Sequence, residues 1–364
     1  MILSCTNCQQ TYPLNTRQWQ CQCGGVFELR NGQGFVRDKI QTREPSLWRY
    51  RAMLPLDRDE CIVSLGEGFT PLVETDVYGL KIHCKAEFLS PTGSFKDRGT
   101  AVLVSALNSL DIKTVVDDSS GNAGASLAAY AARAGMACEI YVPASTSPPK
   151  LAQIAIYGAK LIKVEGPRQA AALAAQEAAS RDAYYASHYG NPFNLQGLKT
   201  IAYEVWEQLG GRVPDNFVLP AGHGTLLLGA YQGFTDLLKA GLIDRLPRLF
   251  AVQALACAPL YEAYRRGSQE VSPVQEGETR AEGIRVSHPV RGRQILAAIR
   301  QTGGAIVAVD DGEIGKAHHE LAQRGFYVEF TSAAPVAAMK ELRSTITADQ
   351  VTVVPLTGSG FKSM

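Results

Sequence analysis

Ser90-Pro-Thr-Gly-Ser-Phe-Lys-Asp-Arg-Gly99 places one lysine, Lys96, directly after a glycine-containing turn that carries hydroxyl side chains. The pattern predicts that a helix begins at this lysine. The partial positive charge of a helix N-terminus favours the neutral amine that attacks an aldehyde, and its free N–H groups can hold an anion nearby. We therefore expect Lys96 to form a Schiff base. The alternative is a surface lysine at the start of a helix, which is the usual place for lysine.

Short β-branched runs alternate with alanine- and leucine-rich runs from residue 81 onward, which is the pattern of a parallel sheet covered by helices. The predicted fold class is α/β, with two open α/β domains. The first series comprises strands 114–117, 139–142 and 161–164 and helices 122–135, 150–158 and 169–181. The second comprises strands 216–219, 249–253, 305–309 and 351–354 and helices 200–209, 225–239, 290–300, 313–324 and 333–343. Residues 266–287 are polar and are predicted to form a surface excursion.

Glycine-rich junctions follow three of the predicted strands. Ser119-Ser-Gly-Asn-Ala-Gly124 and Gly222-His-Gly-Thr225 each lead from a strand into a helix, where backbone N–H groups can hold an anion. Thr357 follows the last strand and should lie at the carboxyl edge of its sheet. Taken alone, each junction also fits a simpler explanation: an ordinary helix cap, loop geometry or a strand-ending turn.

Several further motifs occur along the chain in a fixed order. They are Cys5-Thr-Asn-Cys8, Cys21-Gln-Cys23-Gly-Gly25, Leu65-Gly-Glu-Gly-Phe-Thr-Pro-Leu72, the lysine segment, Ser119-Ser-Gly-Asn-Ala-Gly-Ala-Ser126, Gly197-Leu-Lys-Thr200, Ala221-Gly-His-Gly-Thr225 and Leu356-Thr-Gly-Ser-Gly-Phe361. Together they resemble the threonine synthase branch of the pyridoxal-phosphate enzymes of fold type II, which share the tryptophan-synthase-β fold. The resemblance extends along the whole chain, and several motifs in the expected order are specific evidence.

The resemblance implies that the cofactor is pyridoxal 5'-phosphate and that Lys96 is the catalytic lysine. Phe95 and neutral groups would surround its amine and lower its pKa. The residues implied to bind the cofactor are Phe95, Asn122 at the phenolate oxygen, Gly222, His223, Gly224 and Thr225 at the phosphate, and Thr357 at the pyridine nitrogen. Ser119 and Ser120 would bind the α-carboxylate of the substrate. For the charged neighbours Lys85, Glu87, Asp97 and Arg98, salt bridges are the default expectation.

A threonine synthase converts O-phospho-L-homoserine and water to L-threonine and phosphate, here through Lys96 aldimine chemistry. Asn194 stands where short-chain members commonly have a phosphate-binding arginine, so phosphohomoserine would need Lys199, Arg98 or another cation. Phe330 also replaces a proline that is common in the family. These departures would suit a related lyase: a phosphoserine-dependent β-replacing enzyme similar to cysteate synthase, or a serine/threonine dehydratase. An alternative of a different class is a non-catalytic zinc-ribbon interaction protein.

Four of the eight cysteines form the pattern Cys5-x2-Cys8-x12-Cys21-x-Cys23, which approximates the spacing of a structural zinc ribbon. The one-residue spacing of the final pair is tighter than usual, which leaves weak binding, another ion or no metal as open outcomes. The other four, Cys61, Cys84, Cys138 and Cys257, lie mostly in apolar surroundings and are predicted to be buried thiols.

Lysine plus arginine number 36 against 35 acidic residues, so charge gives no reason to expect nucleic acid or an anionic membrane as a partner. The N-terminus lacks a signal-peptide pattern, and no run approaches the ~18 apolar residues that span a bilayer. A soluble cytoplasmic enzyme is expected, and the resemblance implies a homodimer. Because the chain stops seven residues after Thr357, with no regulatory domain, allosteric dehydratases are disfavoured.

Domain boundaries follow from these patterns. Residues 1–30 are predicted to form a zinc-ribbon-like module. Residues 31–84 plus 192–364 are assigned to a large α/β domain that carries the phosphate loop, within which 37–61 is a linker packed on the main body. Residues 85–191 are assigned to a smaller α/β domain that carries the loop for the substrate carboxylate.

Overall fold

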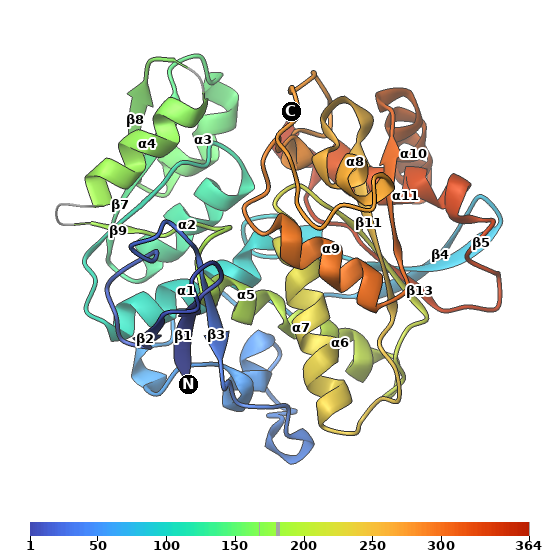
Figure 1. Cartoon of the computed structure of the whole chain (residues 1–364), viewed down its shortest axis with the longest axis horizontal. Coiled ribbons are helices and arrows are strands. Elements are labelled where there is room, and N and C mark those ends of the chain that lie inside the picture. Colours follow the sequence, from blue (N-terminus) through green and yellow to red (C-terminus); the bar gives the residue numbers. More distant parts are fainter. Residues whose placement is uncertain (167, 180–182, 364) are drawn as a thin grey trace. The chain divides into compact units, whose positions relative to one another are not determined.

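The protein, seen in a computed structural model, is described over residues 1–166, 168–179 and 183–363 (Figure 1). It divides into two units. The first combines Met1–Gly68 with Ser90–Leu198, and the second combines Phe69–Leu89 with Lys199–Met364. Residues 31–68 and 192–198, which were assigned from sequence to the large domain, therefore belong with the first unit.

The first unit contains a four-stranded parallel sheet in the order β8-β7-β6-β9. Its strands are β6 (Thr114–Asp117), β7 (Ala137–Pro143), β8 (Lys160–Val164) and β9 (Tyr184–Tyr185), and its helices are α1 (Lys96–Ser109), α2 (Asn122–Arg133), α3 (Pro148–Ile156), α4 (Arg168–Ala179) and α5 (Pro192–Leu198). Neighbouring strand residues point to opposite faces of a sheet. Val115 joins the core formed with α1 and α2, whereas Val116 packs with Ala175 of α4. These helices therefore cover opposite faces.

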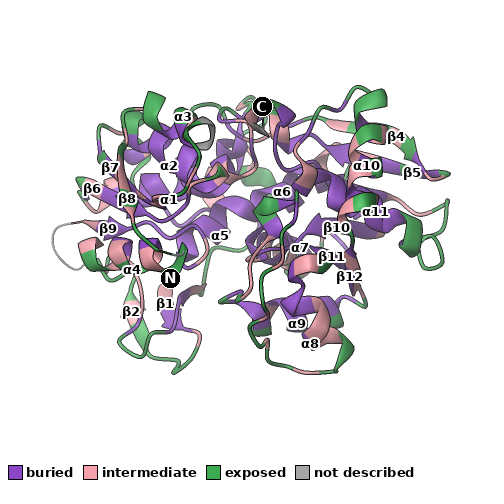
Figure 2. Ribbon diagram, turned by 90° about the horizontal axis from the view of Figure 1, so that it is seen from above, coloured by how far each residue is buried: buried purple, intermediate pink, exposed green. Residues whose placement is uncertain are grey.

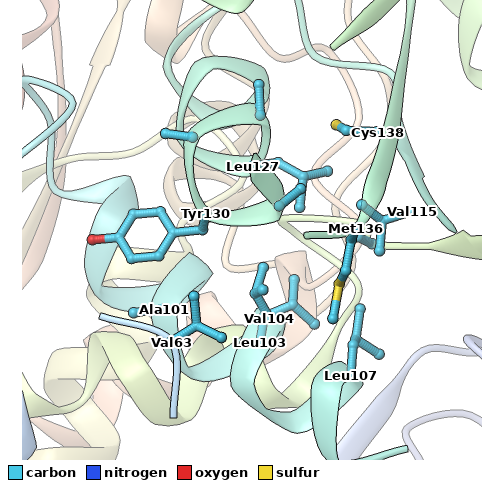
Figure 3. Packing of buried hydrophobic residues seen from close by; sticks show 14 of the residues in the cluster. Val63, Ala101, Leu103, Val104, Leu107, Val115, Leu127, Tyr130, Met136 and Cys138 are labelled. Atoms are coloured by element: carbon cyan, nitrogen blue, oxygen red, sulfur yellow. The ribbon is translucent and has the colours of Figure 1, made fainter. Parts of the chain in front are cut away.

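The core between α1 and α2 is mainly aliphatic. In Figure 3, Leu127 and Tyr130 of α2 lie near Leu103 and Val104 of α1, and Val115 stands on the sheet beside them. Burial continues into α5, all seven of whose residues are buried (Figure 2). The helices that follow the glycine-containing turns are thus held by a close-packed core, which restricts their movement.

The N-terminal residues form a small antiparallel sheet in the order β2-β1-β3, from β1 (Ile2–Cys5), β2 (Thr11–Pro13) and β3 (Phe27–Arg30). We call residues 1–30 the cysteine module. Three 3-10 helices follow: η1 (Arg37–Lys39), η2 (Leu47–Met53) and η3 (Asp59–Cys61). Leu47, Trp48 and Leu54 join the core of the first unit, so the linker packs on a main body as predicted, but not within the large domain to which it was assigned.

A buried carboxylate holds this linker in place. Glu67 is fully buried and accepts hydrogen bonds of 2.6 Å from both Trp48 Nε1 and the Tyr130 hydroxyl. The backbone N–H of Leu65 donates a third, at 2.8 Å. Because a buried charge is costly unless donors surround it, Glu67 fixes η2 and α2 relative to each other.

The second unit contains a six-stranded sheet in the order β12-β11-β10-β13-β5-β4, parallel except for the pair β4/β5. Its strands are β4 (Leu72–Val77), β5 (Leu80–Lys85), β10 (Asn216–Pro220), β11 (Arg248–Ala254), β12 (Ala305–Val309) and β13 (Thr352–Pro355). Its helices are α6 (Thr200–Gln208), α7 (Thr225–Lys239), α8 (Pro259–Arg265), α9 (Gly292–Gln301), α10 (Asp311–Gln323) and α11 (Phe330–Leu342), with the 3-10 turns η4 (Glu87–Leu89), η5 (Leu255–Cys257), η6 (Glu282–Ile284) and η7 (Gly360–Ser363). None of the helices in the described ranges is both long and apolar enough to cross a membrane.

The structure confirms the predicted helices and strands of both series, with ends that shift by up to three residues. The end of the helix expected over 169–181 lies outside the described residues. The four scattered cysteines are buried, as expected. The hairpin β4/β5 was not predicted, because the polar run Glu74-Thr-Asp76 hides the alternation of an edge strand. Its turn, Tyr78-Gly79, has positive φ at both residues, as a tight hairpin requires.

The excursion predicted at 266–287 is only partly correct. Ala281 and Ile284 are buried in the core of the second unit, with at most 1% of each residue exposed. The prediction followed the polar composition of this segment. Two buried apolar side chains are nevertheless enough to anchor the segment to the core.

The salt bridge expected for Lys85 is confirmed. Its Nζ lies 2.8 Å from Glu204 Oε2, and both side chains are fully buried. The same amine donates to the Thr70 carbonyl at 2.6 Å and to Gln208 Oε1 at 2.9 Å. The Lys85–Glu204 pair therefore joins β5 to α6. Removing either side chain would leave the other as an uncompensated buried charge.

Tyr130→Phe should lower the free energy of unfolding by about 1–3 kcal/mol, because Glu67 would lose a hydrogen bond to its buried carboxylate. Urea denaturation followed by circular dichroism measures the change. Tyr184→Phe is a matched control, since this buried hydroxyl accepts from the neutral Asn191 amide at 3.0 Å and its loss should cost less. A loss no larger for Tyr130→Phe than for the control would contradict the role given to Glu67.

Candidate functional site

Lys96 is the first residue of α1, as the sequence predicted. The turn before it contains Gly93 at φ 80°, and the Lys96 amine lies 4.8 Å from the centre of the Phe95 ring. Lys96 is half-buried while the next four residues are buried, so the lysine stands at the boundary between the core and an accessible face. This is the placement that a lysine needs to reach a ligand from a fixed backbone.

Asp97 fixes the turn that precedes the lysine. Its carboxylate is fully buried and accepts hydrogen bonds from Thr92 N at 2.7 Å, Thr92 Oγ1 at 2.6 Å and Ser126 Oγ at 2.6 Å. Ser126 belongs to α2, so one carboxylate joins the turn, the start of α1 and the neighbouring helix. From sequence, only a default salt bridge was expected for Asp97, since contacts to Thr92 and Ser126 depend on the fold.

The junction at 119–124 leads from β6 into α2. Gly121 is the N-cap, and its backbone N–H donates a 3.3 Å hydrogen bond to Ser119 Oγ, so the local capping role considered for this junction is present at Ser119. Ser119 is buried, Ser120 and Asn122 are half-buried, and Gly121 is exposed. A Cβ at Gly124 would overlap the Ser119 carbonyl oxygen, so only glycine permits this tight turn. The backbone at the start of α2 is therefore free of bulky side chains.

Two acidic residues at the end of β6 were not predicted as part of the site, although their position just before Ser119 was a usable signal. Asp117 Oδ2 lies 3.2 Å from His188 Nδ1, and the Tyr185 hydroxyl donates to Asp118 Oδ1 at 2.6 Å. Burial raises the pKa of Asp117 to about 7 and lowers the pKa of His188 well below its usual value. Burial also raises the pKa of Asp118, and the neighbouring Asp117 charge adds to that effect. The positive charge of Lys96 opposes the rise in the pKa of Asp117 and adds to the fall in the pKa of His188.

In the second unit, the loop Gly222–Thr225 follows β10 and opens α7. Gly224 is its N-cap, at φ 68°, and a Cβ there would collide with Ile295 of α9. A Cβ at Gly222 would lie 2.9 Å from the Gly283 carbonyl oxygen, so residues near η6 cover the loop. His223 is half-buried, and Thr225 is buried. The result is a helix N-terminus with close backbone packing, which suits an anion.

Thr357 is also in the second unit, directly after β13. It is fully buried, and its Oγ1 lies 3.0 Å from Ser332 Oγ of α11. Ser332 Oγ in turn accepts from Gly358 N at 2.9 Å. The turn that carries Thr357 is thus locked to α11 by neutral hydroxyl groups, with Ser332 as a partner that the sequence did not indicate.

The predicted site residues therefore form two groups, each gathered within its own unit. Phe95, Lys96, Ser119, Ser120 and Asn122 lie at the starts of α1 and α2 in the first unit. Gly222, His223, Gly224, Thr225 and Thr357 follow β10 and β13 in the second.

The four N-terminal cysteines converge, with all four sulfur atoms within 4.8 Å of one another. The Sγ atoms of Cys5 and Cys23 are 3.4 Å apart and those of Cys8 and Cys21 are 3.5 Å apart. Tetrahedral zinc with Zn–S bonds of about 2.3 Å requires sulfur separations near ~3.8 Å, so the donor set fits. The Tyr12 hydroxyl, 3.1 Å from Cys21 Sγ, lowers the pKa of that thiol, whereas hydrogen bonds to Cys21 and Cys23 raise the pKa of Cys8.

Comparison with known proteins identifies the family. The family described as "Pyridoxal-phosphate dependent enzyme" matches residues 63–358. The chain belongs to this family. Pyridoxal phosphate is accordingly its cofactor, and the chain is a threonine synthase-like lyase.

Curated relatives agree with that assignment, and solved structures share the fold. A threonine synthase from Methanocaldococcus jannaschii is 37% identical across 100% of this chain and 93% of the relative, and one from Mycobacterium tuberculosis is 37% identical across 86% of this chain and 87% of the relative. Among solved structures, maize serine racemase has a TM-score of 0.70 at 21% identity, covering 80% of this chain and 88% of its own. A fungal L-serine ammonia-lyase from Rhizomucor miehei has a TM-score of 0.68 at 22% identity, covering 80% and 93%. At these identities the structures show the shared fold alone.

The residues of each unit fit the cofactor of this pyridoxal-phosphate-dependent family. Among the described residues, the Ser90 and Ser94 hydroxyls beside the Lys96 turn are buried without a hydrogen-bond partner, which suits a polar ligand there. Gly222 and Gly224 leave a backbone cradle that a Cβ would fill. An amine, neutral hydroxyls and an N–H loop are the donors that a phosphorylated aldehyde needs.

Gly224→Ala should weaken pyridoxal phosphate binding by about tenfold or more, because the added methyl must push the loop away from Ile295. Absorbance titration of the apo protein with pyridoxal phosphate measures the dissociation constant. Gly241→Ala is the matched control: Gly241 has a nearly identical φ of 69°, but a Cβ there meets nothing within 4 Å. Equal affinities in the two variants would contradict the cradle.

Asp117→Asn tests the pH dependence of stability. Between about pH 4 and pH 7 the folded protein keeps a proton on Asp117 that the unfolded chain, at the ordinary pKa of 3.8, has released. The folded state thus binds more protons, so the native protein loses stability as pH rises through this window. The variant lacks this loss and should gain on the order of 3 kcal/mol relative to the native protein between pH 5 and pH 8. Urea unfolding of both proteins at the two pH values measures this; a pH-independent difference would refute it.

Proposed function

We propose that the protein is a threonine synthase that converts O-phospho-L-homoserine and water to L-threonine and phosphate. The observation that carries the proposal is Lys96 at the first position of α1, directly before Asp97, whose buried carboxylate joins the Thr92 turn to Ser126 of the helix that begins at Asn122. The relatives named threonine synthase support the choice of reaction within the family.

In this proposal, residues of the first unit bind and orient. Lys96 carries pyridoxal phosphate and then moves the proton of the substrate α-carbon. Ser119 and Ser120 hold the substrate α-carboxylate at the start of α2, where N–H groups favour an anion. Asn122 donates a hydrogen bond to the phenolate oxygen of the cofactor, and Phe95 keeps water from the amine. When bound, pyridoxal phosphate supplies the electron sink for the carbanion that this proton transfer creates.

Residues of the second unit would hold the other parts of the same cofactor. The backbone N–H groups of Gly222, His223 and Gly224 and the Thr225 hydroxyl bind its phosphate. Thr357 faces the pyridine nitrogen with a neutral hydroxyl, which does not keep that nitrogen protonated as an aspartate would. A moderated electron sink suits elimination and replacement over transamination.

A second candidate function is favoured by the surroundings of Asn194. This side chain is buried, and a Cβ at Gly99 would lie 2.5 Å from its Oδ1, so it packs on α1 at the position where short-chain threonine synthases commonly have an arginine. Lys199 Nζ lies 3.1 Å from Asp236 Oδ2, which offsets its charge. With the arginine replaced and Lys199 engaged, a related lyase acting on phosphoserine, serine or threonine is the alternative. Phe330 stacks on His318 at 4.2 Å and does not discriminate between the two.

Three further features stay predictions. Residues 1–30 are proposed to act as a structural zinc module whose four thiolates leave no open position for catalysis. A cytoplasmic location agrees with an amino-acid biosynthetic role. A homodimer is expected, and size-exclusion chromatography with light scattering would test it.

The substrate is tested by incubating the holoenzyme separately with O-phospho-L-homoserine, O-phospho-L-serine, L-serine and L-threonine. Release of phosphate together with L-threonine from the first compound supports the threonine synthase. Turnover of the others with none of phosphohomoserine would replace it with the related lyase, and no turnover of any would favour a non-catalytic protein.

Lys96→Ala should reduce turnover by at least about 10³-fold, because the protein loses both the group that holds the cofactor and the one that moves the proton. Circular dichroism should show an unchanged fold. Lys113→Ala removes an exposed lysine from the same unit and should leave turnover unchanged. Substantial activity in Lys96→Ala would overturn the assignment of the catalytic lysine.

A further inference from the structure

The cysteine module contacts the four-stranded sheet of the first unit at Trp19. Trp19 stands two residues before Cys21, and its ring meets the Tyr185 ring edge to face, with centroids 4.8 Å apart and planes at 85°. Tyr185 is fully buried on β9, in the cluster that includes Val116 of β6 and Ala175 of α4. A residue next to the metal-binding pattern therefore packs directly against the sheet of the first unit.

Tyr185 also contacts the residue that precedes the candidate substrate loop residues Ser119 and Ser120. Its hydroxyl donates to Asp118 Oδ1 at 2.6 Å and lies 2.9 Å from the Tyr189 hydroxyl. Asp118 is buried and directly precedes Ser119 and Ser120. A buried carboxylate beside a second one, Asp117, depends on its donors to keep its position. Tyr185 is therefore a determinant of where the residues 118–120, the substrate loop, lie.

The module is also attached on either side of Trp19. Arg17 Nη2 donates to the Leu110 carbonyl at the end of α1 at 3.0 Å. A Cβ at Gly190 would lie 3.4 Å from Val26 Cγ1, which shows how closely the module approaches the turn after β9. The buried apolar cluster of the module consists of Leu3, Cys5, Cys21 and Phe27. So small a core needs a metal to keep its shape.

We propose that the metal-held cysteine module positions the substrate loop through Trp19, Tyr185 and Asp118, with Trp19 and Tyr185 as positioning residues. The inference rests on the proposed role of Ser119 and Ser120 in binding the substrate carboxylate. Zinc fixes the segment before Cys21, that segment fixes the Tyr185 ring, and the Tyr185 hydroxyl fixes Asp118. Loss of zinc loosens the loop without changing Lys96 or the second unit.

Hydrogen–deuterium exchange on the holoenzyme tests the coupling independently of turnover. The native protein is compared with zinc bound and after removal of zinc by a chelator, with metal content measured in each sample. Zinc removal should speed exchange of the amides of 118–120 by about fivefold, while amides of α7 stay unchanged. In Tyr185→Phe the loop should already exchange at the faster rate, and zinc removal should add little.

Kinetics distinguish positioning from general destabilisation. Tyr185→Phe and zinc removal should each raise KM for O-phospho-L-homoserine by about tenfold and leave kcat within about twofold, because the loop binds the carboxylate and does no chemistry. Trp19→Ala should also raise KM by about tenfold. Trp19→Phe keeps the ring contact and should have the native KM. Tyr184→Phe, on the same strand but bonded to Asn191 and not to Asp118, is the control and should leave KM unchanged.

Three results would overturn the proposal: a native protein that binds no zinc, a loop whose exchange does not respond to zinc removal, or an equal response in the native protein and Tyr185→Phe. Failure of the proposed function gives a different result, since exchange would still respond to zinc while phosphohomoserine released no phosphate. The two failures are thus separable even if Trp19→Ala does not fold.

Discussion

The buried carboxylate of Asp97 is the interaction on which the rest of the site depends. It accepts hydrogen bonds from both the backbone and the hydroxyl of Thr92, before the lysine, and from Ser126, on the next helix. Because a buried carboxylate is stable only while donors surround it, the turn, Lys96 and α2 cannot shift independently. The backbone of Lys96 and that of the Asn122 junction are thereby positioned by one group.

Both units contain the same local arrangement, which suits an anionic group. In each, a strand ends in a glycine-containing turn that opens a helix, and backbone N–H groups take the place of cations. Gln253 supports the second turn, since its side chain donates to the Ala221 carbonyl at 3.0 Å and accepts from Tyr261 N at 3.0 Å. This agrees with a chain whose 36 basic and 35 acidic residues nearly cancel. In the proposed function, ligand charge is met by local geometry rather than by a basic surface.

Features with a local signal could be predicted from the sequence. Alternating strand and helix patterns located β6, α2, β10 and α7, and motif order indicated the cofactor. The contacts that complete the site join residues far apart in the chain: Asp117 and His188 are 71 positions apart, and Tyr185 and Asp118 are 67. No regular sequence spacing predicts either pair, so these contacts are seen only in the folded structure. The burial of Ala281 and Ile284 escaped prediction for a related reason, because the segment around them is polar and their apolar partners are distant in the chain.

The most direct test of the central claim is to reduce the holoenzyme with borohydride, which fixes pyridoxal phosphate to the lysine that carries it, and to locate the added mass by peptide mass spectrometry. The predicted result is a single modified peptide with the pyridoxyl group on Lys96. Modification of a different lysine, or a holoenzyme that carries no modified lysine after reduction, would contradict the assignment of Lys96.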